Sequence, residues 1–171
     1  MRFTVRRLVP NDHEALRAIR LRALSLEPHA FGSTFERESM FSDDIWRQRL
    51  RPDGNPHFGC FDESSRLVGL VAGMFDEADA HGAELVSMWV DRAARSTGAT
   101  DALIDEVVRW AVAHGCTSIR LHVTDGNDRA ERTYRRNGFV RTGHTKVRER
   151  DGFPEVEMQR PLNRATGGGG R

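Results

Sequence analysis

The 171-residue sequence predicts one α/β (α+β) domain built on a mixed sheet. Two observations lead to this prediction. Seven stretches alternate apolar and polar side chains as half-buried strands do, and four stretches repeat apolar residues at helical spacing. The chain shows no internal repeat and no internal linker, so we expect residues 1–162 to form a single domain. Residues 163–171 include four consecutive glycines and are expected to be disordered.

Most of the expected elements are bounded by residues that commonly start or end them. Pro10 ends the first strand, and Asn11 with Glu14 resembles a capping box for the first helix. Ser42 can cap the second helix, and Asn137-Gly138 ends the last helix as a left-handed cap does. The expected strands cover residues 2–8, 57–61, 67–75, 84–90, 118–123, 139–145 and 156–160, and the expected helices cover about 11–26, 42–50, 99–114 and 127–136. Residues 27–40 are expected to be irregular.

The charge balance gives no reason to expect a polyanionic partner. Lys and Arg number 26 against 25 Asp and Glu, a net charge of +1, so neither nucleic acid nor an anionic membrane surface is expected to bind. No apolar run approaches the length of a membrane span, and the first residues do not read as a signal peptide. We therefore expect a cytoplasmic protein.

The cysteine content is also typical of a cytoplasmic protein. Cys60 and Cys116 lie far apart in apolar surroundings, so we expect reduced, buried thiols rather than a disulfide. The seven histidines are scattered without zinc-like spacing. No metal site is expected.

The most informative stretch is the loop after the strand at residues 84–90. This loop contains Arg95 and Gly98 and leads into a helix, an order that directs backbone N–H groups and the positive end of a helix dipole toward one point. Such a turn can hold a phosphate, although an ordinary left-handed turn before a helix would show the same single glycine. The P-loop and dinucleotide-binding patterns are both missing.

A second motif downstream makes the reading more specific. The loop motif Arg95-x-x-Gly98-x-Thr100 is followed by Asn127-x-x-Ala130-x-x-x-Tyr134-x-x-x-Gly138-Phe139. Together the two motifs resemble the acetyl-CoA-binding core of the GNAT (Gcn5-related N-acetyltransferase) superfamily, most densely over residues 84–143. The resemblance implies a GNAT fold, a central mixed and mostly antiparallel sheet of six to seven strands flanked by about four helices. It also allows a homodimer.

The resemblance implies that acetyl-CoA binds as a co-substrate. The implied cofactor-binding residues are Met88, Trp89, Val90, Arg95, Ser96, Thr97, Gly98, Ala99, Thr100, Asn127, Ala130 and Tyr134. Loop N–H groups would hold the pyrophosphate, and the backbone of residues 88–90 would pair with the pantetheine amides. Arg95 could instead be simply exposed, and Asn127 could instead be an N-cap. Thr100 departs from the Gly or Ala usual in the family, although its hydroxyl can itself donate to a phosphate.

The resemblance also implies catalytic residues. Acyl transfer to an amine needs a neutral amine, a polarised thioester carbonyl and a proton for the departing thiolate. Tyr134, the only tyrosine, occupies the position of the family's general acid, and its alternative role is a packed aromatic. Glu84 matches the position of a water-linked general base, and its alternative role is a solvated carboxylate. His122 could line the acceptor site, support the base or be structural.

The expected function is therefore acetyl-CoA-dependent N-acetylation of a primary amine, on a small molecule or on a protein N-terminus or lysine, by direct attack. Neither cysteine lies in a motif position, which disfavours a covalent intermediate. Two alternatives stay open. One is a catalytically idle module that binds acyl-CoA as a sensor or partner domain, and the other is transfer of a longer acyl chain that fills space near Trp89 and Met88.

The acceptor itself is not specified by any motif. The resemblance implies an acceptor groove formed by residues 27–40 and 146–154. Within the first segment, Glu36 and Glu38 could attract a cationic amine, and Phe31 and Phe35 could pack an apolar body. Both pairs could equally have no contact with the substrate.

Overall fold

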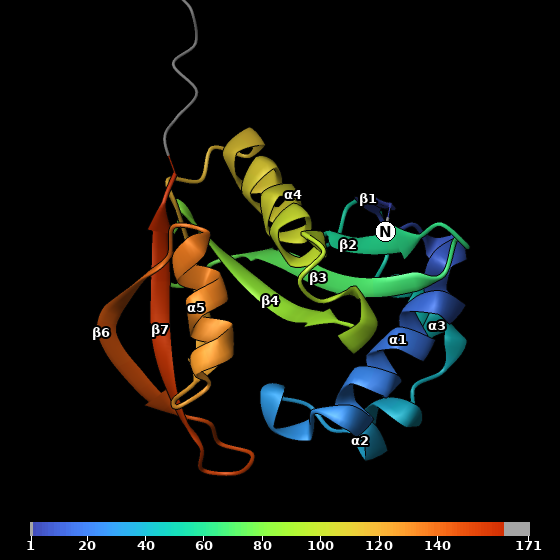
Figure 1. Cartoon of the computed structure of the whole chain (residues 1–171), viewed down its shortest axis with the longest axis horizontal. Coiled ribbons are helices and arrows are strands. Elements are labelled where there is room, and N and C mark those ends of the chain that lie inside the picture. The colour runs from blue at the N-terminus through green and yellow to red at the C-terminus, as the bar shows by residue number, and fades with distance from the viewer. Residues whose placement is uncertain (1, 163–171) are drawn as a thin grey trace, which may run out of the picture.

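Seven strands form one sheet in the order β1-β2-β3-β4-β5-β7-β6 (Figure 1). The computed structural model describes residues 2–162, so the expected disordered tail lies outside the described residues. The strands are β1 (Phe3–Arg7), β2 (His57–Asp62), β3 (Leu67–Phe75), β4 (Gly82–Val90), β5 (Ser118–Thr124), β6 (Val140–Val147) and β7 (Pro154–Pro161). The β4–β5 pair is parallel and the other neighbouring strands of this sheet are antiparallel. The mixed, mostly antiparallel sheet is thus confirmed.

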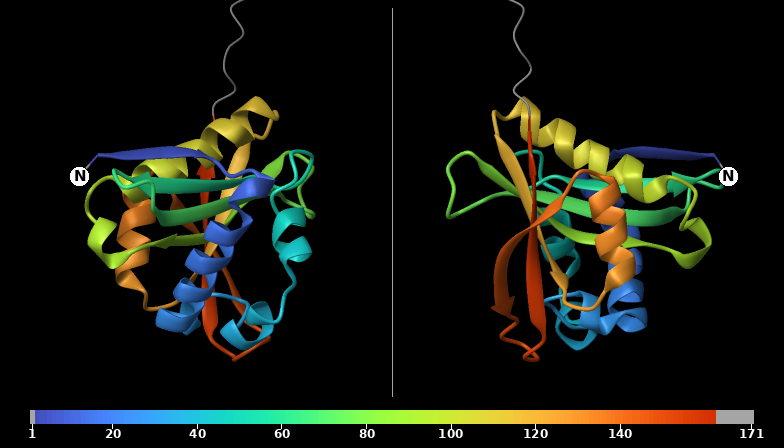
Figure 2. Two further views of the ribbon diagram at one scale, coloured as in Figure 1. Left: turned by 90° about the vertical axis from the view of Figure 1, so that its right-hand side faces the viewer. Right: turned by 60° about the vertical axis from the view of Figure 1, so that its left-hand side comes forward.

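Helices cover both faces of this sheet (Figure 2). The α-helices are α1 (His13–Leu26), α2 (Phe35–Ser39), α3 (Asp43–Gln48), α4 (Ala99–Ala113) and α5 (Asp128–Arg136). Single 3₁₀ turns lie at η1 (Pro10–Asp12), η2 (Pro28–Ala30) and η3 (Arg92–Ala94). The short helix α2 lies inside the segment that the sequence predicts to be irregular. Its Thr34 hydroxyl accepts a hydrogen bond from the Arg37 backbone N–H at 3.2 Å, which caps its first turn.

Strand β3 lies between two hydrophobic cores, one on each face of the sheet. Val71 packs into a core with Leu103, Ile104 and Val107 of α4, whereas its neighbour Leu70 packs into a second core with residues of α1 and α3. Successive side chains of a strand point to opposite faces, so one buried strand serves both cores. β3 is buried along most of its length, which explains why its sequence is nearly continuously apolar.

The N-terminal caps of α1 and α3 differ from the predicted ones. The predicted Asn11–Glu14 capping box is wrong: helix α1 begins at His13, and the Asp12 carboxylate accepts the Val9 backbone N–H at 2.8 Å. Pro10 explains the difference, because it starts a 3₁₀ turn before the helix. Ser42 occupies the N-cap position of α3, but its side chain makes no capping hydrogen bond.

The two ends of α5 follow the predictions. The Asn127 side chain accepts the Ala130 backbone N–H at 3.2 Å, so its N-cap role is confirmed. At the other end Gly138 has φ 85°, the left-handed conformation expected of a helix C-terminal cap. These two caps fix the length of α5.

β4 and β5 separate soon after they pair. Their register covers only Gly82–Glu84 opposite Ser118–Arg120. A bulge then interrupts β4, because Leu70 pairs with Trp89 while Ala72 pairs with Val86, and Ser87 adopts φ 58°. The second half of β4 thus lacks a strand partner on the β5 side. The backbones of β4 and β5 diverge from this point (Figure 2), and we call this divergence the V-shaped opening.

The cysteines agree with the expectation from sequence. Cys60 and Cys116 are both buried and unpaired. Burial, with Asp62 as a minor cause, raises the pKa of the Cys60 thiol to about 11, so it is a poor nucleophile at neutral pH. Within residues 2–162, no helix is both long and apolar enough to cross a membrane.

Candidate functional site

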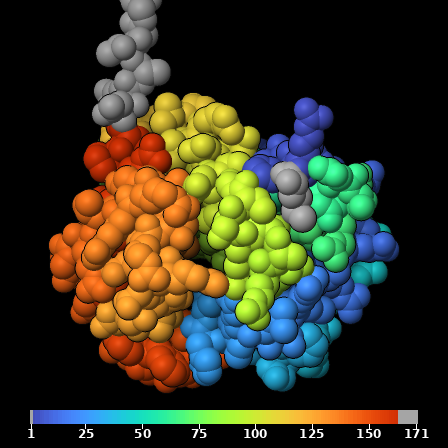
Figure 3. All heavy atoms as spheres, viewed as in Figure 1, coloured from blue at the N-terminus to red at the C-terminus, as the bar shows by residue number. Residues whose placement is uncertain are grey.

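A cavity of about 490 Å³ lies where β4 and β5 diverge, between the loop after β4 and helix α5. We call it the loop cavity. In Figure 3 the orange surface of α5 and the yellow-green surface of the segment after β4 border each other on this face of the molecule. The predicted cofactor-binding residues that line it are Met88, Trp89, Val90, Arg95, Ser96, Gly98, Thr100, Asn127, Ala130 and Tyr134.

The loop between β4 and α4 has the backbone shape of an anion cradle. Ser96 and Gly98 both adopt left-handed backbone conformations, with φ 65° and 89°. Within the described part of the chain, the backbone N–H groups of residues 96–101 have no hydrogen-bond acceptor. Free N–H groups at the start of a fifteen-residue helix fit a phosphate group, because the helix dipole adds positive potential there.

Thr97 and Ala99 are the two predicted cofactor-binding residues that do not line the cavity. The Thr97 hydroxyl donates to the Ala94 carbonyl at 2.6 Å, and the Ala99 side chain is buried in the core. Both side chains thus shape the loop. Only their backbone N–H groups remain available to a ligand.

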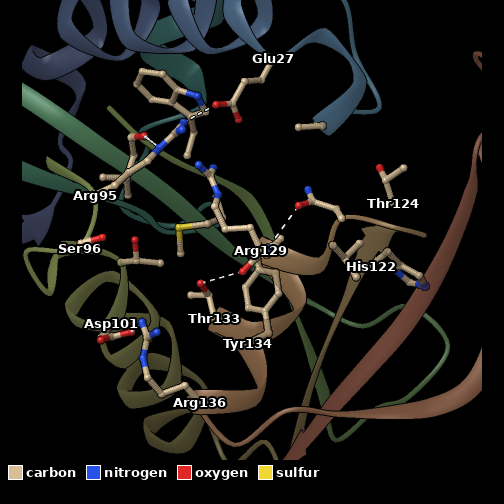
Figure 4. A pocket seen from close by; sticks show the side chains of 18 of the residues that line it. Glu27, Arg95, Ser96, Asp101, His122, Thr124, Arg129, Thr133, Tyr134 and Arg136 are labelled. Atoms are coloured by element: carbon tan, nitrogen blue, oxygen red, sulfur yellow. Dashed lines mark hydrogen bonds and ion pairs between the residues drawn. The ribbon is translucent and has the colours of Figure 1, made fainter. Parts of the chain in front are cut away.

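Arg95 is held by two partners. Its Nε donates to the Val90 carbonyl at 2.8 Å, and its Nη2 pairs with the Glu27 carboxylate (Figure 4). The alternative of a simply exposed arginine is therefore wrong. Arg95 ties the loop to the end of β4 and to the residue after α1, and its charge is largely balanced by Glu27.

Other cations face the loop cavity from α5. Arg136 pairs with Asp101 at 2.8 Å, whereas the Arg129 guanidinium makes no ion pair with any described residue (Figure 4). The sequence interpretation did not single out Arg129. The available signal was its place between Asn127 and Ala130, since the same first turn of α5 points all three toward the cavity.

Tyr134 lies in the wall of the loop cavity and is 9% exposed. Its ring packs edge-on against Phe139, with centroids 5.9 Å apart. Burial raises the pKa of Tyr134 well above its ordinary value, so the phenol stays protonated at neutral pH. Within the described residues the hydroxyl makes no hydrogen bond, and it is available as a proton donor.

Glu84 is held in a polar cluster at the narrow end of the V-shaped opening. Its Oε1 lies 3.1 Å from His122 Nδ1, and its Oε2 lies 4.0 Å from Arg120 Nη2. The hydrogen bond with His122 lowers the pKa of Glu84 and outweighs the opposing effect of burial. Glu84 is therefore ionised at neutral pH. It is not a solvated carboxylate at a strand edge, which was its alternative.

The neighbours of Glu84 extend the cluster across β4, β5 and β7 and to Asp76, the residue after β3. Arg120 donates to Asp76 at 2.7 Å and lies 3.7 Å from Glu157. The second ring nitrogen of His122 also lies 3.7 Å from Glu157. Paired charges hold buried side chains in fixed orientations, so this cluster orients the Glu84–His122 pair.

A second cavity, of about 1000 Å³, lies beside Glu84 and is bounded by the β6–β7 hairpin. We call it the hairpin cavity. Besides Glu84–Ser87 of β4, its walls come from the α1–α2 region and from residues 146–150 and Glu155 of the hairpin. These segments overlap the two that the resemblance implies for the acceptor groove, residues 27–40 and 146–154.

The four residues proposed to meet the acceptor are placed differently from one another. Phe31 lines the hairpin cavity, whereas Phe35 and Glu36 do not. Glu38 is 1% exposed and accepts hydrogen bonds from Arg20 and Arg49. The suggestion that Glu38 attracts a cationic amine is therefore wrong, because two arginines already balance its charge.

The two cavities meet at His122 and Ala30, which line both of them. His122 belongs to β5 at the V-shaped opening, and Ala30 belongs to η2. The η2 segment is held in place by contacts with both neighbours: Thr124 of β5 donates to the His29 carbonyl at 3.3 Å, and Arg150 of the hairpin donates to the Pro28 carbonyl at 2.9 Å. Molecules bound in the two cavities could therefore touch near His122.

Comparison with protein families gives the class of protein. The model of the Acetyltransferase (GNAT) family matches residues 19–139. The chain therefore belongs to the GNAT family. No curated protein matches the sequence.

Solved structures share the whole fold at low identity. A GNAT-family acetyltransferase from Streptococcus pneumoniae superposes with a TM-score of 0.79 at 19% identity, covering 95% of this chain and 100% of that one. A phosphinothricin acetyltransferase from Sinorhizobium meliloti, in complex with AcCoA, gives 0.79 at 22% identity, covering 97% and 91%. The ribosomal-protein-alanine N-acetyltransferase from Brucella melitensis gives 0.75 at 24% identity, covering 93% and 99%. These likenesses establish the GNAT fold.

Proposed function

We propose that this protein is an acetyl-CoA-dependent N-acetyltransferase that transfers an acetyl group to a primary amine by direct attack. The observation that carries the proposal is the meeting of the two cavities at His122, beside Glu84. One cavity has the features of an acyl-CoA site, and the other has room for an acceptor. A donor and an acceptor bound from opposite sides would meet next to a hydrogen-bonded carboxylate and imidazole.

The loop cavity supports the donor half of the proposal. The free N–H groups of residues 96–101 would hold the pyrophosphate, and Arg129 would contact a further phosphate. The unpaired side of β4 would bond the pantetheine amides, as an added strand does. Arg95 already occupies the Val90 carbonyl, so these bonds fall to Met88 and Trp89. The AcCoA complex of the Sinorhizobium meliloti relative supports the same donor.

Three residues supply the acid–base chemistry. Glu84 and His122 would accept, directly or through one water, the proton that the amine loses as it attacks the thioester carbon. Tyr134 would donate its proton as the carbon–sulfur bond breaks, which releases the thiol. Neither Cys60 nor Cys116 lines either cavity, which supports direct transfer over an acyl-cysteine intermediate.

The test is thiol release from acetyl-CoA in the presence of a broad amine panel, with products identified by mass spectrometry. We expect one acetylated amine for each thiol released. A silent panel combined with tight CoA binding would favour the sensor module instead. Repeating the assay with longer acyl-CoAs tests the alternative of a longer acyl chain, which predicts higher turnover than with acetyl-CoA.

A further inference from the structure

The walls of the hairpin cavity carry more positive than negative side chains. Its cationic residues are Arg20, Arg37, Lys146, Arg148 and Arg150, whereas its carboxylates are Glu84, Glu149 and Glu155. On the hairpin side, Lys146 and Arg148 both pair with Glu155, and Arg150 pairs with Asp151. The hairpin cations are thus largely balanced locally. The excess positive charge belongs to the opposite wall, which α1 and α2 form.

Arg20 on that wall has an unused donor. Its Nε and Nη2 donate to Glu38 at 3.1 and 2.9 Å, and its guanidinium lies 4.8 Å from the centre of the Phe31 ring. Its Nη1 is buried and has no hydrogen-bond partner within residues 2–162. Arg20 as a whole is 8% exposed. Leaving a charged donor buried without an acceptor is costly, and either an anion or a water molecule can supply that acceptor.

The charge around Arg20 is not balanced by its neighbours. Glu38 accepts from Arg49 at 3.0 Å as well as from Arg20, so one carboxylate faces two guanidinium groups. Arg37, the residue before Glu38 in α2, also lines the cavity, is exposed and makes no ion pair with a described residue. This wall therefore presents a net positive charge to whatever enters the cavity.

A negative charge lies at the inner end of the same cavity. Glu84 lines it there, ionised and hydrogen-bonded to His122. A cavity with a carboxylate at the transfer point and free arginines on a separate wall matches a molecule that carries both an amine and an acid.

Resting on the proposed function, we infer that the acceptor is an amine bearing an anionic group, such as an amino acid or an aminoalkylphosphonate. Arg20 and Arg37 bind the acid group and thereby place the amine beside Glu84 and His122. An arginine fork can hold a carboxylate or phosphonate oxygen in a fixed direction, which a lysine cannot do as well. Purely cationic amines are disfavoured by the same wall.

The first test uses wild-type protein and matched acceptors. The acids are the proteinogenic L-amino acids, β- and γ-amino acids and aminoalkylphosphonates. Each acid is compared with its amide or ester and with the amine that lacks the acid group. We expect kcat/KM for the best acid to exceed that of its neutral analogue about tenfold or more, because a charged hydrogen bond is lost. If amides or diamines are acetylated as well as the acids, the inference fails while the proposed function stands.

The second test uses variants. Arg37→Gln should raise KM for the acid about fivefold and leave KM for its amide unchanged. Arg17→Gln is the matched control, since Arg17 belongs to α1 but pairs with Asp43 outside the cavity. Arg20→Lys keeps the charge beside Glu38 and should also raise KM for the acid, with a thermal melt to verify folding. Equal effects on acid and amide would overturn the assignment of these arginines.

A third readout does not require turnover. Thermal shift of the CoA-loaded protein should show stabilisation by anionic amines that is absent with their amides and weaker in Arg37→Gln. If thiol release is silent for every amine, this shift still supports the anion site while the proposed function fails. If no anionic amine stabilises the protein, the inference is overturned.

Discussion

The loop cavity and the hairpin cavity are built in different ways. The cradle of the loop cavity consists of backbone N–H groups from one continuous segment, residues 96–101. The hairpin cavity is formed by side chains from distant segments, such as Arg20, Glu84 and Lys146. Backbone donors suit a ligand common to a whole family, whereas side chains select one acceptor. We therefore expect the first cavity to bind a ligand common to the family and the second to select the acceptor.

This contrast predicts that variants on the two sides alter different kinetic constants. Changes at the junction should lower kcat, changes in the loop cavity should raise KM for acetyl-CoA, and changes in the hairpin cavity should raise KM for the acceptor. A loop-cavity variant that raises KM for the acceptor, or a hairpin-cavity variant that raises KM for acetyl-CoA, would contradict this assignment of the two cavities.

The largest effect is expected at the junction, for Glu84→Gln. Removing a positioned proton acceptor should lower kcat by about 10³-fold, with KM for acetyl-CoA unchanged. Steady-state kinetics over both substrates measures this. Glu106→Gln is the control, because Glu106 pairs with Arg109 on α4 and lines neither cavity. An unchanged kcat in Glu84→Gln would remove Glu84 from the base role.

The second prediction concerns stability of the hairpin cavity wall. Glu38→Gln leaves Arg20 and Arg49 without a buried counter-charge and should lower the free energy of unfolding by about 3 kcal/mol at pH 7. Burial by itself would raise the pKa of Glu38, but hydrogen bonds from Arg20 lower it below its usual value. Its contribution is therefore present above pH 4.5 and is lost as pH falls through the folded-state pKa.

Urea unfolding of wild type and Glu38→Gln across this pH range is the measurement. The difference between the two proteins should shrink as pH falls below 4.5. A difference that stays constant with pH would show that the carboxylate charge is not what stabilises this wall.

A smaller effect is expected for Tyr134→Phe. The substitution keeps the ring that packs against Phe139 and removes the hydroxyl. We expect kcat to fall about 30-fold, because the departing thiolate loses its proton donor. Calorimetry should give nearly the same acetyl-CoA affinity. Undiminished turnover would exclude the acid role of Tyr134.

The smallest effect is expected for Arg129→Gln in the loop cavity. Losing one exposed phosphate contact should raise KM for acetyl-CoA about threefold to tenfold, more at low salt, with kcat unchanged. Arg132→Gln is the matched control, since Arg132 is exposed on the same helix but does not line the cavity. Equal responses of the two variants would mean that Arg129 contributes only general positive charge.

The same contrast explains how far the sequence could predict the molecule. The succession of strands along the chain, the Gly98 turn and both caps of α5 were predictable, because each depends on neighbouring residues. Helix α2 was missed because five residues are too few to show a helical period. The first capping box was misassigned because Pro10 starts a 3₁₀ turn that moves the cap to Asp12.

Side-chain partners were less predictable than backbone. Glu38 reads as a free carboxylate in the sequence, yet Arg20 and Arg49 reach it from positions 18 and 11 residues away. Arg95 reads as an exposed cation, yet Glu27 pairs with it across 68 residues. Periodicity carries no information on such distant pairs, so the side-chain partners on the acceptor side emerge only from the three-dimensional structure.

The claim that donor and acceptor meet directly, from separate cavities, is tested most directly by initial velocities measured over a grid of acetyl-CoA and acceptor concentrations. We predict intersecting double-reciprocal lines, as expected when both substrates are bound together, and no acetylated protein in the mass spectrum. Parallel lines, together with an acetylated residue that forms without acceptor and disappears when acceptor is added, would contradict direct transfer.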